Sequence, residues 1–204
     1  TKIIMNAKSI KGKSTEDINA ALSEIMDGNF KPTLAIVFLS VQQNREAISK
    51  LLHDKGIQIF GATTAGEFID GEIEAGSIVM MLLDMNPAYF KLEFLETGPE
   101  TVLQDAIKLG VAGKETFTNP AFIIANSGVS LDGEPIVEGI IQGFERSPSS
   151  AHREVKVFGG KAGDDLQLES TFVFTNGKSK DCALVALIID EDKIDVRGIA
   201  TCGW

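Results

Sequence analysis

The stretch Phe60-Gly61-Ala62-Thr63-Thr64-Ala65-Gly66-Glu67 returns near the other end of the chain as Phe158-Gly159-Gly160-Lys161-Ala162-Gly163-Asp164. Each copy ends a strand-like run, at 56–60 and at 154–158, with small residues followed by an acid. Small residues permit a tight turn with accessible backbone N–H groups, and the acid adds one carboxylate. The pair therefore predicts two equivalent turns in two related parts of one fold.

The elements around the two glycine segments follow the same order. In each half a helix, a strand, a second helix and a second strand precede the glycine turn, and a strand pair follows it. Helices are indicated by apolar residues at helical spacing, and strands by short apolar runs or by alternation of apolar and polar residues. The expected helices cover 14–28, 47–56, 99–107 and 132–144, and the expected strands cover 33–40, 56–60, 77–83, 89–95, 121–125, 154–158, 171–174, 182–189 and 194–200.

The repeated order favours an internal duplication, with a first half at 1–96 and a second half at 97–204. Apolar runs such as 34–39 and 183–189 predict strands that are buried on both faces. Two mixed sheets packed against each other, with helices outside, would bury all of these strands. The predicted fold is an α/β (α+β) fold of two tandem α-β-α-β-β-β repeats, an αββα-like sandwich.

Composition excludes several classes of function. The 204 residues are 44% hydrophobic and 24% charged, as in ordinary globular domains. The formal net charge of -10 disfavours nucleic acid and anionic membrane surfaces as partners. No apolar run approaches the roughly 18 residues needed to span a bilayer, and two cysteines do not make a disulfide framework, so we expect a cytoplasmic protein. Because the chain opens at Thr1 and stops at Trp204 directly after a strand, we expect a piece of a longer protein.

The glycine turns are candidate ligand contacts. Their backbone N–H groups suit carboxylate or phosphate oxygens, while the acids would accept hydrogen bonds from a ligand amine or hydroxyl. Asn126-Ser127 follows a buried strand, and ligand contacts are common beyond such strand ends. The alternative interpretation is that the glycines only let two sheets approach closely and that 126–128 is a turn. The candidate ligand-binding residues are Gly61, Thr63, Thr64, Gly66, Glu67, Asn126, Ser127, Gly159, Gly160, Lys161 and Asp164.

Catalytic and metal chemistry have weaker support. His53 and His152 have no nearby Cys or His partner, so no metal site is assigned. Cys202 has no assigned histidine to activate it, and Thr1 would need processing and a base to act as an N-terminal nucleophile. We therefore expect a protein that is not an enzyme and assign no catalytic residue, with a hydrolase using one of these two nucleophiles as the alternative.

Several of these motifs together resemble a known family. The segments 61–67 and 158–165, with 173–177, the strand 183–189 and the terminal Gly203-Trp204, look like the N-terminal part of a FIST domain. The resemblance covers most of the chain. It implies an intracellular bacterial or archaeal sensory module that binds a small ligand, with an amino acid or a small carboxylate as the expected ligand.

The resemblance also implies partners. A C-terminal FIST region normally follows the Gly-Trp strand, and such modules work beside histidine kinases, cyclic-dinucleotide enzymes or chemotaxis receptors. Some relatives bind haem and sense nitric oxide. No haem ligand of the family maps onto His53 or His152, so no cofactor is predicted and haem-based sensing is kept only as an alternative. The first hypothesis is a non-catalytic sensory module with its ligand in a cleft between the two halves.

Overall fold

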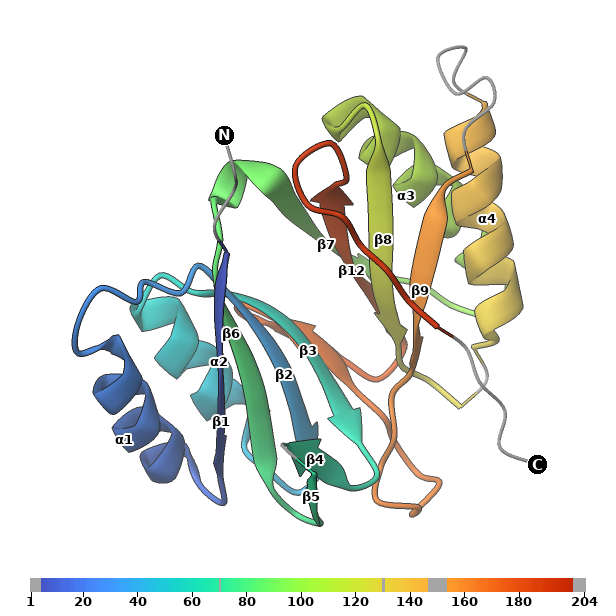
Figure 1. Ribbon diagram of the computed structural model, residues 1–204. Helices are drawn as coiled ribbons and strands as arrows, with labels where there is room; N and C mark the ends of the chain where they lie inside the picture. Colours follow the sequence, from blue (N-terminus) through green and yellow to red (C-terminus); the bar gives the residue numbers. More distant parts are fainter. Residues whose placement is uncertain (1–4, 70, 130, 147–153, 200–204) are drawn as a thin grey trace.

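The computed structural model describes residues 5–69, 71–129, 131–146 and 154–199, and Figure 1 shows the arrangement of its elements. The helices are α1 (Thr15–Met26), α2 (Arg45–Asp54), α3 (Val102–Thr116) and α4 (Gly133–Glu145), with a short 3-10 turn η1 (Pro87–Tyr89). The strands are β1 (Asn6–Gly12), β2 (Leu34–Ser40), β3 (Gln58–Thr64), β4 (Glu67–Ile69), β5 (Glu72–Glu74), β6 (Ile78–Asp84), β7 (Phe90–Glu96), β8 (Pro120–Asn126), β9 (Lys156–Lys161), β10 (Val173–Thr175), β11 (Lys178–Lys180) and β12 (Ala183–Asp190).

Within the described residues the strands form two large sheets and one hairpin. The larger sheet has the order β1-β6-β2-β3-β10-β11, and the smaller one has the order β7-β12-β8-β9. Each large sheet contains one parallel pair, β2–β3 or β8–β9, and its other pairs are antiparallel. The hairpin consists of β4 and β5. The expected mixed α/β fold is confirmed.

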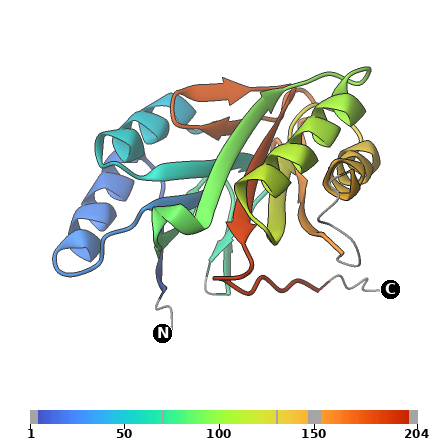
Figure 2. The same cartoon turned by 90° about the horizontal axis from the view of Figure 1, so that it is seen from above.

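The two large sheets face each other and the helices cover their outer faces, as Figure 2 shows from above. Helices α1 and α2 pack on the larger sheet through side chains such as Ile18 and Leu52, and α3 and α4 pack on the smaller sheet through side chains such as Ile140. Between the sheets lies a third cluster that includes Phe60 from one sheet and Val185 from the other. No helix in the described ranges is both long and apolar enough to cross a membrane.

Local sequence explains where the first two helices begin. The Ser14 side chain accepts a hydrogen bond from the Asp17 N–H at 3.1 Å, as the capping pattern predicts. The Asn44 side chain accepts one from the Ala47 N–H at 3.0 Å in the same way. Each cap satisfies one of the N–H groups that a helix leaves without an internal partner at its first turn.

Helices α3 and α4 approach each other closely because glycines lie in their contact. A Cβ atom on Gly143 would collide with the carbonyl oxygen of Ile107, and one on Gly139 would lie 2.7 Å from the carbonyl oxygen of Leu103. The pair forms one closely packed outer layer over the smaller sheet, and that sheet supplies one wall of the site described below.

Strand pairing crosses the predicted boundary between residues 96 and 97. Strand β7, from the first predicted half, pairs with β12, and β10, from the second, pairs with β3. Each large sheet therefore contains strands from both halves. The division into 1–96 and 97–204 stays a prediction about the sequence repeat.

Three strand regions were not expected: β1, the hairpin β4–β5, and β11. β1 is an edge strand with mostly exposed side chains, so its sequence lacks the buried run that predicts a strand. The hairpin β4–β5 lies in an acidic segment whose glutamates pair with lysines of β1 or the loop after it: Glu72 with Lys11 and Glu74 with Lys13. The pattern of apolar residues predicts none of these three regions.

The predicted strand at 194–200 is wrong over the described residues 194–199, which form no strand, and Ala200 lies outside the described residues. Instead, Ile194 and Val196 pack onto the cluster between the two sheets. Gly198 lies so close to Phe158 of β9 that a Cβ atom would collide with the ring. The apolar alternation therefore serves packing across the face of a sheet rather than pairing at its edge.

Candidate ligand-binding cavity

The two glycine segments meet. The Gly163 N–H donates to the carbonyl oxygen of Thr63 at 2.8 Å, and the Asp165 N–H donates to that of Thr64 at 3.4 Å. A Cβ atom on Gly163 would lie 2.8 Å from the backbone nitrogen of Ala65. The segments thus join the end of β3 to the chain that leaves β9, and they tie the two large sheets together at one end.

Next to this junction lies a cavity of about 580 Å³ between the sheets. Strands β2, β3 and β6 of the larger sheet form one wall, strands β8 and β9 of the smaller sheet form the other, and β4 lies at its margin. A volume of this size is typical of sites that hold small molecules. Its lining residues are Ser9, Ile36, Phe38, Phe60, Ala62, Thr63, Thr64, Gly66, Glu67, Phe68, Ile69, Val79, Met80, Met81, Ile123, Ile124, Ala125, Gly159, Gly160, Lys161 and Ala162.

Small residues explain why the sheets leave this space unfilled. Ala125 and Gly160 are register partners on β8 and β9, and Ala62 on β3 also lines the cavity. A Cβ atom on Gly160 would meet no atom within 4 Å, so this position faces open space. Larger side chains there would close the gap by packing, as they do elsewhere between the two sheets.

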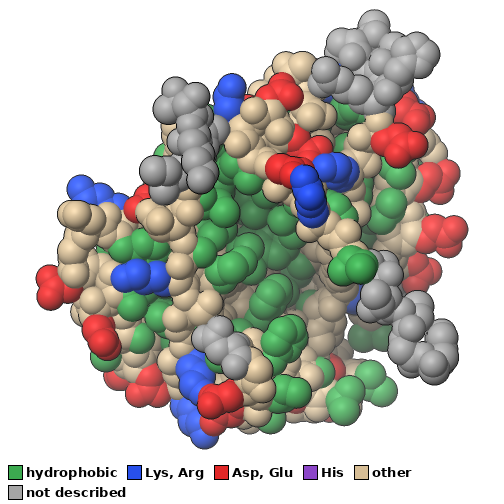
Figure 3. Space-filling model, viewed as in Figure 1, with side chains coloured by type: hydrophobic (Ala, Val, Ile, Leu, Met, Phe, Trp, Pro, Cys, Tyr) green, Lys and Arg blue, Asp and Glu red, His purple; other side chains and the backbone are tan. Residues whose placement is uncertain are grey.

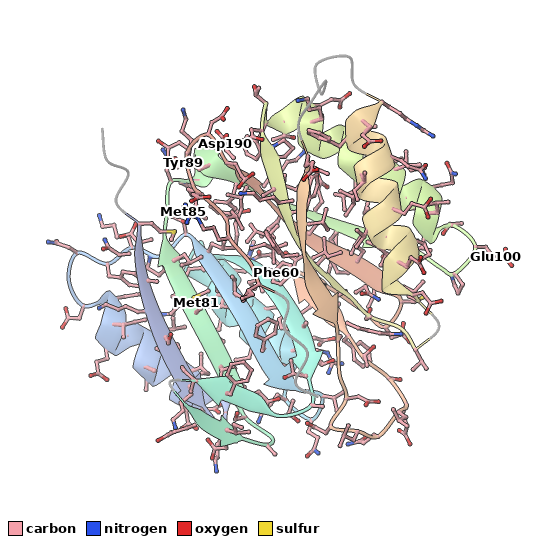
Figure 4. All side chains as sticks on the ribbon, turned by 45° about the vertical axis from the view of Figure 1, so that its right-hand side comes forward. Phe60, Met81, Met85, Tyr89, Glu100 and Asp190 are labelled. Atoms are coloured by element: carbon pink, nitrogen blue, oxygen red, sulfur yellow. The ribbon has the colours of Figure 1, made fainter. Side chains whose placement is uncertain are left out.

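The walls are predominantly apolar. Figure 3 shows hydrophobic side chains gathered in a hollow near the centre of one face of the molecule. Phe60 of β3 and Met81 of β6, which Figure 4 labels, both line the cavity. Phe60 is 2% exposed, whereas Met81 and Phe38 are 41% and 36% exposed. The cavity therefore runs from the buried interior to an open apolar mouth.

The polar groups of the first glycine segment hydrogen-bond within the protein. The Glu67 side chain, which is 2% exposed, accepts from the Thr64 hydroxyl at 2.7 Å and from the N–H and hydroxyl of Ser77 at 2.9 and 3.2 Å. The hydroxyl of Thr63 accepts from the Phe172 N–H at 2.9 Å. Thr63, Thr64, Gly66 and Glu67 all line the cavity, and ligand binding by them stays a prediction.

Three residues of the second segment, Gly159, Gly160 and Lys161, line the same cavity and also a second one of about 220 Å³. The second cavity lies toward α4 and includes Asn126 in its lining. The Lys161 ammonium donates to the carbonyl oxygen of Val129 at 2.9 Å. The end of β9 therefore separates the large apolar cavity from a small one.

Two predicted ligand contacts have structural partners instead. Gly61 does not line the cavity, because the ring of Phe174 occupies the place where its side chain would be. Ser127 is fully buried, donates from its hydroxyl to the carbonyl oxygen of Lys180 at 3.0 Å, and accepts from the Ala183 N–H at 3.1 Å. Both residues fix the packing of neighbouring strands.

Asp164 shapes a loop rather than the cavity wall. Its side chain, 4% exposed, accepts from the N–H groups of Glu169 at 2.7 Å and Ser170 at 3.2 Å, and it lines neither cavity. Burial opposes ionisation, but hydrogen bonds from the backbone N–H groups of 167–170 outweigh it and hold the pKa of Asp164 below its ordinary value. The carboxylate thereby stabilises a loop in which Asp165, Leu166 and Leu168 adopt positive φ angles.

A model of the FIST N domain matches residues 33–204, which is most of the chain and includes both glycine segments. The chain belongs to the FIST N-domain family. This is a sensory-type domain. The resemblance carried by the paired glycine segments is thereby confirmed. No curated protein matches this sequence.

Among solved structures, a crystal structure of polyphosphate kinase from Porphyromonas gingivalis is similar at 10% identity, with a TM-score of 0.22. The match covers 90% of this chain and 44% of that chain. At so low a TM-score the likeness says nothing about the fold or the activity of this FIST N domain.

The described lining of the cavity in this FIST N domain holds no histidine, cysteine or tyrosine as a haem ligand, and the haem-ligating residue type that it does hold is methionine, at Met80 and Met81. His53 lies exposed on α2, and His152 lies outside the described residues. Thr1 and Cys202, the two nucleophiles of the hydrolase alternative, lie outside them too. In the described ranges, no three His, Cys, Asp or Glu side chains gather as metal ligands.

Sequence reasoning missed the apolar walls of the cavity. Residues such as Ile36, Phe38 and Met81 belong to strands that were interpreted as core on both faces. A usable signal was present, because Ala62, Ala125 and Gly160 are small residues that each come two positions after a Phe or Ile in the same strand.

Proposed function

We propose that this FIST N domain is a non-catalytic sensory module that binds one small molecule in the cavity between its two large sheets. The observation that carries the proposal is the cavity itself, about 580 Å³ in volume, with apolar walls and a few polar groups at the glycine junction. Most binding sites for small molecules combine these features. Family membership supports a sensory role, and the expected ligand is an amino acid or a small carboxylate.

A cavity-filling variant tests the location. Gly160→Leu adds a side chain where even a Cβ atom meets nothing within 4 Å, so the fold has room for the first added atom. Gly98→Leu is the matched control, because Gly98 has the same open surroundings and lines neither cavity. Both variants must keep the circular dichroism spectrum of the unaltered protein.

The assay is a thermal-shift screen of amino acids, small carboxylates and apolar small molecules, followed by calorimetric titration of the hits. A ligand present at 100 times its Kd stabilises the fold by about 2.7 kcal/mol, which corresponds to roughly 5–10 °C for a domain of this size. We expect hits to bind Gly98→Leu normally and Gly160→Leu at least about tenfold more weakly. Equal binding to both variants would place the ligand elsewhere, and a screen without hits would count against a ligand-binding role.

A sensory role also needs a partner that responds to the ligand. We propose the partners expected from the family, a C-terminal FIST region and a histidine kinase or cyclic-dinucleotide enzyme. The measurement is the activity of such an enzyme with this domain present, with and without a hit from the screen. An activity that is the same in both conditions, for every enzyme tried, would contradict this part of the proposal.

A further inference from the structure

The charge in the cavity wall restricts the chemistry of the ligand. Among the described lining residues the ionisable side chains are Glu67 and Lys161, and the rest are apolar, glycine, serine or threonine. Glu67 is 2% exposed, so its charge lies in the protein rather than in water. Charges in such surroundings act strongly on a neighbouring ligand.

The hydrogen-bond partners of Glu67 are neutral. They are the hydroxyl of Thr64 and the N–H and hydroxyl of Ser77, and no ion pair of Glu67 occurs in the described part of the chain. A carboxylate has about four acceptor positions. Three are filled, so one stays available to a donor.

Lys161 is poorly placed to offset this charge inside the cavity. In the register of β8 and β9 it pairs with Asn126, which lines the second cavity, and its ammonium donates to the carbonyl oxygen of Val129. Its side chain is exposed to solvent at the end of β9. The lysine therefore lies at the rim, and the interior of the cavity has the charge of Glu67 alone.

We propose that the cavity takes a predominantly apolar molecule whose polar group is a hydrogen-bond donor, an ammonium or a hydroxyl, and that it discriminates against carboxylates. This inference rests on the proposed function for the location of the site, and it replaces the amino acid or small carboxylate expected from the family with a ligand that has no free carboxylate. A carboxylate entering the cavity would lose its hydration and face Glu67, whereas a donor would fill the remaining acceptor position. The apolar body of the ligand would lie against side chains such as Phe60, Ile36 and Met81.

The test uses one apolar body with three head groups. The compounds are 3-phenylpropan-1-amine, 3-phenylpropan-1-ol and 3-phenylpropanoate, at pH 7.5, where the amine is protonated and the acid is ionised. Each competes with the neutral fluorescent probe N-phenyl-1-naphthylamine for the unaltered protein. We expect the amine and the alcohol to displace the probe at least about tenfold more effectively than the carboxylate.

The outcomes separate this inference from the proposed function. If the probe does not bind, or binds Gly160→Leu as well as it binds Gly98→Leu, the inference of an apolar ligand in the cavity is overturned, whereas the proposed function fails only if the thermal-shift screen gives no hits or its hits also bind both variants equally. If the probe binds in the cavity but the carboxylate competes as well as the amine or alcohol, or none of the three displaces it below about 1 mM, only the head-group inference is overturned.

A charge-removing variant attributes the selectivity to one side chain. Glu67→Gln keeps the shape of the residue and removes its charge, and we expect the preference for the amine over the carboxylate to fall at least about tenfold. Glu72→Gln is the control, because it removes an exposed charge from the same hairpin outside the cavity. An unchanged preference in a folded Glu67→Gln protein would overturn the role of Glu67.

Discussion

Replacing Gly163 with alanine should destabilise the fold, because the added methyl group would enter the contact between the two glycine segments. Its Cβ atom would lie 2.8 Å from the backbone nitrogen of Ala65 and 3.1 Å from the carbonyl carbon of Thr64. These neighbours are backbone atoms held by the bond from the Gly163 N–H to the Thr63 carbonyl oxygen, so they cannot turn aside as a flexible side chain would. The segments would have to separate.

Overpacking of this kind costs about 1–3 kcal/mol, equivalent for a domain of this size to a fall in Tm of roughly 2–12 °C. The matched control is Gly160→Ala, three residues earlier in the same segment, where the Cβ atom meets nothing within 4 Å. Because alanine restricts the unfolded chain more than glycine does, this control should be neutral or stabilising by up to about 1 kcal/mol. The predicted difference between the two variants is therefore about 1–4 kcal/mol.

The assay is urea unfolding followed by circular dichroism, with the midpoint and the slope fitted for each variant. A lower midpoint at an unchanged slope identifies a loss of stability in the folded state. Equal free energies of unfolding for Gly163→Ala and Gly160→Ala would refute the reasoning, since the close contact between the glycine segments would then make no measurable contribution to stability.

Two further predictions concern the same scaffold. The pKa of Asp164 is lower in the folded protein, so its contribution to stability is present above the unfolded value of about 3.9 and is lost as the pH falls through the folded pKa. We therefore expect the free energy of unfolding of Asp164→Asn to fall less than that of the unaltered protein as the pH is lowered. Urea unfolding from about pH 5 to pH 2 measures this difference. Gly143→Ala should lower the free energy of unfolding by about 1–3 kcal/mol, because its Cβ would collide with the Ile107 carbonyl oxygen. Gly133→Ala, where the Cβ meets open space, should not destabilise α4. Thermal melts in which Gly133→Ala is the less stable variant would contradict the packing of α3 on α4.

The sequence predicted the elements whose side chains are buried on a regular period. Helix α1 begins at its capping serine, and strand β12 is buried along nearly all its length, as a continuous apolar run requires. Edge strand β1 carries no such period because most of its side chains contact solvent. The segment 194–199 has the period but no partner strand, because its apolar side chains are used in packing on the sheet face. Periodicity reports burial, and burial alone does not identify a strand.

The sequence alone did not predict that strands from the two predicted halves pair in the same sheet. Strands β3 and β10 are far apart in the chain, and only their pairing, Ala62 with Val173 and Gly61 with Phe174, reveals that they are neighbours. The sequence signal for this pairing is residue size, because the ring of Phe174 fits against β3 only where Gly61 has no side chain. Such a pair can be recognised once both partners are known, but neither residue identifies the other in advance.

The glycine segments were open to two interpretations, close packing or ligand contact, and the positions divide between them. At Gly61 and Gly163 a neighbour leaves no room for a side chain: the ring of Phe174 at Gly61, and the Thr64–Ala65 backbone at Gly163. At Gly160 the lack of a side chain leaves open space in the wall of the cavity. The two roles depend on each other, because the packing glycines bring the ends of β3 and β9 together and thereby close one end of the space that Gly160 keeps open. A variant that separates the segments should therefore weaken the fold and deform the cavity at once, whereas a variant at Gly160 should change the two cavities that it lines without weakening the fold.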